Sequence, residues 1–171
     1  MSLESIAVRV SLDLRQVVFV GAFAVICHIG PYRRTRDIDL ALATPLSDEE
    51  FEGLGYRIFH EGGKKVIRTR EGVKLDVYTK DVSGIPVPTV FKTAVTKKIG
   101  SAEVKIMCLE ALLVAKMRAS RPQDVEDVQT LCQRLGRKVN WNVVQGVATP
   151  MESAELKNVV SAFTSERRPS T

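Results

Sequence analysis

The sequence predicts a mixed α/β (or α+β) domain followed by a helical C-terminal region. Over the first two thirds of the 171 residues, short β-branched or alternating apolar segments are interleaved with amphipathic ones, as in domains where strands and helices share one core. Beyond residue 108 the apolar residues recur at helical spacing. We therefore expect an α/β core over residues 1–107, a helical region packed on it over residues 108–165, and a flexible tail over residues 166–171.

The first third of the chain is expected to alternate helices with strands. A β-branched strand leads into a tight turn at Gly21, and Gly30 and Pro31 end the short buried helix that follows. The run Ser47-Asp48-Glu49-Glu50 is a capping box that opens another helix. The elements expected here are a helix over 3–16, a strand over 17–20, a helix over 22–29, a strand over 37–43 and a helix from 47 to between 53 and 55.

A strand meander and then a run of helices are expected in the rest of the chain. Glycine-containing turns separate three strands over 56–60, 64–70 and 73–79, and residues 93–107, with Gly100 in the middle, are expected to form another hairpin or an edge strand pair. Residues 80–92 contain Pro86 and Pro88, and we expect them to form a loop. The expected C-terminal helices cover residues 109–119, 123–135, 140–147 and 153–164.

The composition is that of a soluble globular protein, with 44% hydrophobic and 26% charged residues. No apolar run reaches the roughly 18 to 20 residues that a membrane helix needs. The first 16 residues carry acids and arginines within their apolar pattern, unlike a signal peptide. We therefore expect a cytoplasmic protein without a membrane partner.

Cysteines and net charge narrow the class of protein further. Cys27, Cys108 and Cys132 are widely spaced and form no CxxC or zinc pattern, which predicts buried reduced thiols. The net charge of +5 and the pI near 9.2 favour anionic partners. Solubility alone would also account for that charge.

Three acids form a candidate metal site. Asp37 and Asp39 lie on one face of the expected strand 37–43, and two adjacent carboxylates repel each other unless a cation or a proton lies between them. Asp76 joins them if strand 73–79 pairs beside that strand, although a lone strand acid is more often a solvated surface residue. Three oxygen ligands suit Mg²⁺, and two such ions can clamp an in-line phosphoryl displacement.

Gly21 offers the complementary half of such a site. A glycine between a strand and a helix lets a phosphate approach the backbone N–H groups at the helix N-terminus. Many strand-to-helix turns contain glycine, so this signal has weight only beside the acids.

These features together resemble the nucleotidyltransferase superfamily. Its pattern is a hydrophobic residue, Gly, then Gly or Ser, a spacer, Asp-x-Asp or Asp-x-Glu, and a third acid downstream. The segments GAFAVICHIGPYRRTRDIDL and LEALLVAKMRASRPQDVEDVQTL are similar to the AbiEii-like and minimal nucleotidyltransferase branches, some members of which are toxins of toxin–antitoxin pairs. The resemblance covers about residues 17–135.

The resemblance implies a nucleotidyltransferase fold, in which helices flank a twisted mixed β-sheet. It also implies Mg²⁺, with two ions in the site, an NTP as donor, and an acceptor that is a protein, an RNA or a small molecule. A cognate antitoxin is a further candidate partner. The implied catalytic and metal-binding residues are Asp37, Asp39 and Asp76, and the implied nucleotide-binding residues are Gly21, Ala22, Arg33, Thr35, Lys116 and Asp124.

One position departs from the family pattern. Ala22 stands where the motif usually has Gly or Ser, so the backbone N–H is kept while a serine hydroxyl contact to phosphate is lost. The alternative function is therefore a catalytically lapsed module that binds nucleotide, RNA or a protein partner.

Several of these residues also have a purely structural interpretation. Arg33 could belong to a solvated basic turn or pair with Asp37 or Asp39. Lys116 could be a helix lysine that extends to solvent, and Asp124 could be a first-turn helix acid. His28 is expected to be a hydrogen-bonded core residue.

Overall fold

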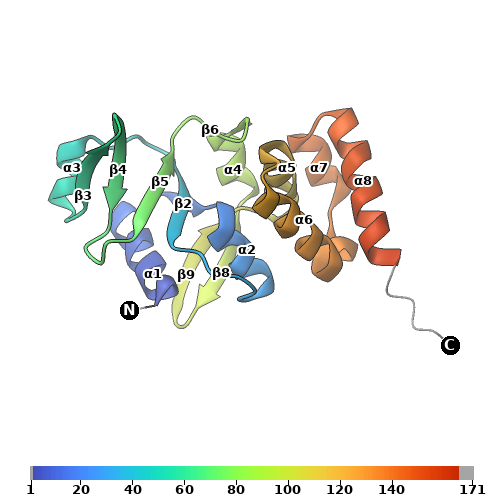
Figure 1. The fold of residues 1–171 in the computed structure, drawn as a ribbon, viewed down its shortest axis with the longest axis horizontal. Coiled ribbons are helices and arrows are strands. Elements are labelled where there is room, and N and C mark those ends of the chain that lie inside the picture. The colour runs from blue at the N-terminus through green and yellow to red at the C-terminus, as the bar shows by residue number, and fades with distance from the viewer. Residues whose placement is uncertain (1, 166–171) are drawn as a thin grey trace.

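The computed structural model of the protein describes residues 2–165 (Figure 1). Residues 166–171, expected to form a tail, lie outside that range. The β3–β4 hairpin lies at one end of the molecule and helices α7 and α8 at the other, with β5, β2, α2 and α5 between them (Figure 1). The helices are α1 (Leu3–Leu14), α2 (Gly21–Ile29), α3 (Asp48–Gly53), α4 (Val87–Thr93), α5 (Leu109–Ala119), α6 (Pro122–Leu135), α7 (Trp141–Val147) and α8 (Pro150–Ser165).

A seven-stranded mixed sheet forms the centre of the fold, in the order β3-β4-β5-β2-β1-β9-β8. The pairs β2·β5 and β1·β9 are parallel, and the other neighbouring strands are antiparallel. Together with the flanking helices, this confirms the predicted fold class. The strands are β1 (Val17–Phe19), β2 (Asp37–Leu42), β3 (Arg57–Glu61), β4 (Lys64–Arg68), β5 (Lys74–Tyr78), β8 (Val95–Ile99) and β9 (Ala102–Ile106).

The prediction of a loop over residues 80–92 was wrong. Strands β6 (Asp81–Val82) and β7 (Ile85–Pro86) form a small ribbon, and α4 follows at once. Pro88 lies in the first turn of α4, where the missing N–H of proline is not needed for a helical hydrogen bond. Val87 and Val90, three residues apart, are both buried and anchor this helix. The two prolines therefore mark the start of a helix.

One hydrophobic core joins the sheet to the C-terminal helices. Leu112 and Leu113 of α5 are buried in the same cluster as Phe19 and Phe23, and Leu131 and Leu156 extend this cluster into α6 and α8. Each such side chain contributes about 1.5–3 kcal/mol through burial, so α5 is held firmly against the site-bearing part of the sheet. No helix within residues 2–165 has the length and apolar character needed to cross a membrane.

Candidate active site

Parallel pairing of β2 with β5 brings the predicted acids together. Asp39 is the direct neighbour of Asp76, and Asp37 is the neighbour of Lys74. Ile38 and Leu75, which alternate with these residues, point into the core and are fully or nearly fully buried. The alternation of buried and polar residues therefore directs all three carboxylates to the same face of the sheet.

Gly21 is required by the carboxylate of Asp39. Its φ is +59°, and a Cβ atom at this position would lie 2.3 Å from Oδ2 of Asp39. The backbone is also tied together here, because Val20 N donates to the Asp39 carbonyl at 2.9 Å. The sequence suggested this glycine as a way for phosphate to approach, and the structure adds a second reason: any side chain here would displace the central acid.

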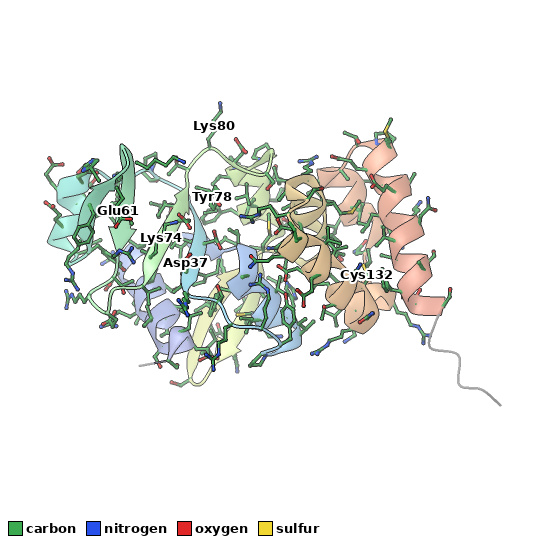
Figure 2. All side chains as sticks on the ribbon, in the orientation of Figure 1. Asp37, Glu61, Lys74, Tyr78, Lys80 and Cys132 are labelled. Carbon is green, nitrogen blue, oxygen red and sulfur yellow. The ribbon has the colours of Figure 1, made fainter. Side chains whose placement is uncertain are left out.

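All nine residues predicted for the site line one cavity of about 180 Å³. It lies between the start of α2, the strand pair β2–β5 and the facing ends of α5 and α6. Figure 2 labels two residues of the sheet side, Asp37 and Tyr78. The residues brought together are Gly21, Ala22, Arg33, Thr35, Asp37, Asp39, Asp76, Lys116 and Asp124.

Electrostatic repulsion is concentrated at Asp39. Burial raises the pKa of this carboxyl, and the nearby Asp76 raises it further. Burial and the negative potential of Asp39 also raise the pKa of Tyr78 to about 12, so its hydroxyl keeps its proton at neutral pH. That hydroxyl donates to Oδ1 of Asp39 at 3.5 Å. A cation near these acids would offset the repulsion.

Lys74 forms an ion pair with one of the three acids. Its Nζ lies 2.8 Å from Oδ1 and 3.0 Å from Oδ2 of Asp76. This hydrogen bonding raises the pKa of Lys74, and the potentials of Asp37 and Asp39 add to the effect. As the side chains lie, no three acids, histidines or cysteines within residues 2–165 are grouped closely enough to hold a metal ion.

A buried charge network links the loop before β2 to the C-terminal helices. Lys116 on α5 is 7% exposed and pairs with Asp124 at 2.9 Å and with Asp127 at 2.8 Å. Arg33 donates to both oxygens of Asp127, each at 2.9 Å, and the Tyr32 hydroxyl donates to the same carboxylate. Burial raises the pKa of Asp127 to about 6, whereas the donors around its carboxylate favour the charged form.

The network corrects two of the structural alternatives and supports a third. Arg33 pairs with Asp127 and with neither Asp37 nor Asp39. Lys116 is enclosed rather than extended to solvent. Asp124 does act as a first-turn acid of α6, since its carboxylate accepts from the Arg121 backbone N–H at 3.2 Å and from the Arg121 side chain at 2.7 Å.

Sequence reasoning missed Asp127, Tyr32 and Lys74. A signal for Asp127 was present: Asp124 and Asp127 are three residues apart and continue the apolar stripe of Val128 and Leu131, so two acids had to face the interior. Lys74 is two residues from Asp76, on the same strand face. Tyr32 carried no such signal.

His28 is hydrogen-bonded as expected. Cys108 and Cys132 are buried as expected, whereas Cys27 is only partly buried. Nε2 of His28 lies 2.8 Å from the Met107 carbonyl, and burial lowers the pKa of this ring. Burial raises the thiol pKa of both Cys27 and Cys132 to about 11, and that of Cys108 also rises. The three thiols are free and protonated at neutral pH.

Solved structures show that the fold is that of the nucleotidyltransferases. An antigenic nucleotidyltransferase-like protein from Paracoccidioides brasiliensis matches with a TM-score of 0.57 and 17% identity, over 96% of this chain and 88% of that one. The structure of ANT(2″)-Ia in complex with adenylyl-2″-tobramycin matches with a TM-score of 0.57 and 16% identity, over 98% of this chain and 100% of that one.

The sequence assigns the family. Residues 3–170 match the model of a family described as nucleotidyl transferase of unknown function (DUF2204), and the chain belongs to this family. No curated protein is similar enough in sequence to count as a match. The family and the fold support nucleotidyl transfer as the general activity.

Proposed function

We propose that the protein transfers a nucleoside monophosphate from an NTP to an acceptor in a Mg²⁺-dependent reaction. The observation that supports this most directly is the β2·β5 register, which sets Asp39 beside Asp76 at the N-terminus of α2. The two neighbouring carboxylates lie beside backbone N–H groups that a phosphate could reach. This arrangement suits transfer of a phosphoryl group.

Asp37, Asp39 and Asp76 would hold Mg²⁺, with two ions in the full site. Their chemistry fits, since Mg²⁺ prefers carboxylate oxygens and a cation would relieve the repulsion that raises the pKa of Asp39. Bound there, Mg²⁺ would neutralise charge on the phosphates and help to orient them.

The remaining site residues would bind and orient the nucleotide. Backbone N–H groups of Gly21 and Ala22 at the α2 N-terminus would donate to its phosphates. Arg33 and Thr35 lie on the loop that borders the cavity, and Lys116 and Asp124 line its opposite side. Lys116 would contribute positive potential from within its ion pairs.

The chemical step joins the acceptor oxygen to the α-phosphorus of the NTP while the bond to pyrophosphate breaks. The acceptor hydroxyl loses its proton, which Asp76 would accept, and pyrophosphate leaves with the electron pair. Positioning and charge neutralisation account for the catalysis, as is usual for phosphoryl transfer.

Incorporation of labelled NTP tests this proposal. The wild type is compared with Asp39→Asn, and Asp48→Asn serves as a matched control because Asp48 pairs with Lys65 on the surface, apart from the cavity. We expect labelling by the wild type and the control and a loss of about 100-fold or more in Asp39→Asn. Equal labelling by all three proteins would contradict the mechanism.

The acceptor can be sought by chemical class. A panel would contain RNA, protein and small molecules, including an aminoglycoside such as the tobramycin portion of the ligand bound to ANT(2″)-Ia. The AbiEii-like resemblance adds the hypothesis of a toxin held by a cognate antitoxin. Growth arrest on expression, relieved by the product of a neighbouring gene, would support that role.

A catalytically lapsed binding module is the second candidate. Ala22 replaces the usual Gly or Ser of the motif, and both Arg33 and Lys116 are already paired with acids. This function predicts a thermal shift with Mg²⁺ and NTP but no transfer to any acceptor. Salt-sensitive RNA binding without transfer would also favour it.

A further inference from the structure

Lys74 lies beside the three acids, and the proposed function gives it no role. It is the cross-strand neighbour of Asp37 and lies two residues before Asp76, on the same face of β5. Figure 2 shows Lys74 and Asp37 next to each other at the centre of the sheet. Its ammonium contacts both oxygens of Asp76, at 2.8 and 3.0 Å.

The cations that line the cavity are held by partners other than these three acids. Lys116 is paired with Asp124 and Asp127, Arg33 is paired with Asp127, and Arg121 is paired with Asp124. The potentials of Lys116 and Arg121 reach Asp39 without a hydrogen bond to it. In the described part of the chain, Lys74 is therefore the cation that directly contacts this group of three acids, at Asp76. It binds the same Asp76 oxygens that a metal ion would need.

We propose that Lys74 is a resident counter-cation that a divalent metal ion must displace from Asp76. It keeps the Asp76 carboxylate neutralised and directed into the cavity while no metal is bound, and it lowers the affinity of the site for the metal. Lys74 is thus a positioning residue that acts through Asp76. This inference rests on the metal site of the proposed function.

The geometry makes displacement feasible. The side chains of Lys74 and Asp76 are 33% and 36% exposed, so the ammonium can move into solvent without leaving a buried charge unpaired. An ion pair that is about one-third exposed is weak enough for a divalent ion to replace. By contrast, the 7% exposed Lys116 could not leave its two acids without a large desolvation cost.

Binding of Mn²⁺ alone, followed by the loss of the free-ion signal in electron paramagnetic resonance, tests the proposal. Lys74→Met keeps the length of the side chain and removes its charge, and we expect it to bind Mn²⁺ about fivefold more tightly than the wild type. Lys74→Arg keeps the charge and should stay within about twofold of the wild type. Asp76→Asn should weaken binding and remove most of the effect of Lys74→Met in the double variant.

Lys80→Met is the matched control, since it makes the same charge change. Lys80 is exposed on the turn after β5 and points away from the sheet (Figure 2). We expect Lys80→Met to change the affinity for Mn²⁺ by less than about twofold. An equal gain in Mn²⁺ affinity in Lys74→Met and Lys80→Met would mean that the gain comes from the change in net charge, and it would overturn the proposal.

The remaining outcomes separate this proposal from the proposed function. Unchanged or weaker Mn²⁺ binding by Lys74→Met would overturn the role of Lys74 alone. Absence of Mn²⁺ binding in the wild type and in Lys74→Met would overturn both the role and the metal site. Tighter binding by Lys74→Met in a protein that transfers no nucleotide would support the role of Lys74 and overturn the proposed function only.

Discussion

At the scale of single residues, the candidate site depends on how closely Asp39 approaches Gly21. The positive φ of Gly21 favours glycine for conformational reasons, and the overlap that an added Cβ atom would have with the Asp39 carboxylate adds a steric one. Gly62 separates the two effects, because it has nearly the same φ, +57°, but no atom within 4 Å of a Cβ placed there.

Substitution of Gly21 by alanine is therefore expected to cost more than the same change at Gly62. The left-handed conformation costs each variant about 1–2 kcal/mol of unfolding free energy. Gly21→Ala must in addition displace the carboxylate of Asp39, so it should lose more stability and also bind Mn²⁺ more weakly. Urea unfolding measures the first effect and a Mn²⁺ titration the second. Equal losses with unchanged Mn²⁺ binding would show that the contact is unimportant.

The raised pKa of Asp39 leads to a prediction about pH. Because its pKa in the folded protein lies above the unfolded value of about 3.9, the unfolded state releases this proton first as pH rises. Ionisation of Asp39 thus reduces stability as the pH rises from about 4 through the folded pKa. Asp39→Asn, which is neutral and of similar shape, should melt at a higher temperature than the wild type at pH 7.

That gain should disappear below about pH 4, where Asp39 is protonated in both states. Thermal melts from pH 3 to 8 without metal would measure it. Asp48→Asn, at an exposed ion pair, provides the baseline. A wild type that is more stable than Asp39→Asn across this range would mean that the charge of Asp39 is already compensated.

At the scale of elements, the sequence predicted helices and strands well wherever a periodic apolar pattern was bounded by turn residues. The strand carrying Asp37 and Asp39 and the strand carrying Asp76 were both predicted, and their pairing follows from the topology of the sheet. The helix α4 was missed because Pro86 and Pro88 suggested a loop, although proline is compatible with a first helical turn.

The charge network could not be derived in the same way. Ion pairs between Arg33, Lys116 and Asp127 join positions up to 94 residues apart in the chain, and no local pattern specifies such a contact. The sequence offered both a surface and a phosphate-binding interpretation of Lys116. Its enclosure between two acids is determined by how α5 packs against α6.

Removal of Asp127 should destabilise the protein strongly. Asp127→Ala would leave the buried Lys116 with a single acid, Asp124, and would remove the acidic partner of the partly buried Arg33, and the typical cost is roughly 3–5 kcal/mol. Glu126→Ala, on the exposed side of the same helix, should change stability by less than about 0.5 kcal/mol. Urea unfolding of the two variants gives the comparison. A cost below about 1 kcal/mol for Asp127→Ala would mean that the network contributes little.

At the scale of the whole molecule, the core continues from the sheet into the helical region without a break. The sequence suggested a boundary near residue 108, but α5 shares its buried residues with α2 and the central strands. We therefore expect residues 1–107 and 108–165 to unfold together.

Trp141 makes this expectation measurable, because it is the single tryptophan of the sequence and lies in α7. Its fluorescence reports on the helical region, and far-ultraviolet circular dichroism reports on the entire fold. The two urea transitions should coincide in midpoint and slope. An earlier transition for Trp141 would mean that the helical region is a separate folding unit.

The central place of β2 in the sheet also determines which part of the site can adjust. Residues 40–42 of the strand pair with β1 on one side, and residues 37–41 pair with β5 on the other. The backbone amides where the two pairings overlap should be among the slowest in the protein to exchange with deuterium. The backbone at Asp39, whose carbonyl also accepts from Val20 N, is therefore effectively fixed on the timescale of ligand binding. Any adaptation to substrates of different size must come from rotation of side chains or from the loop over residues 31–36.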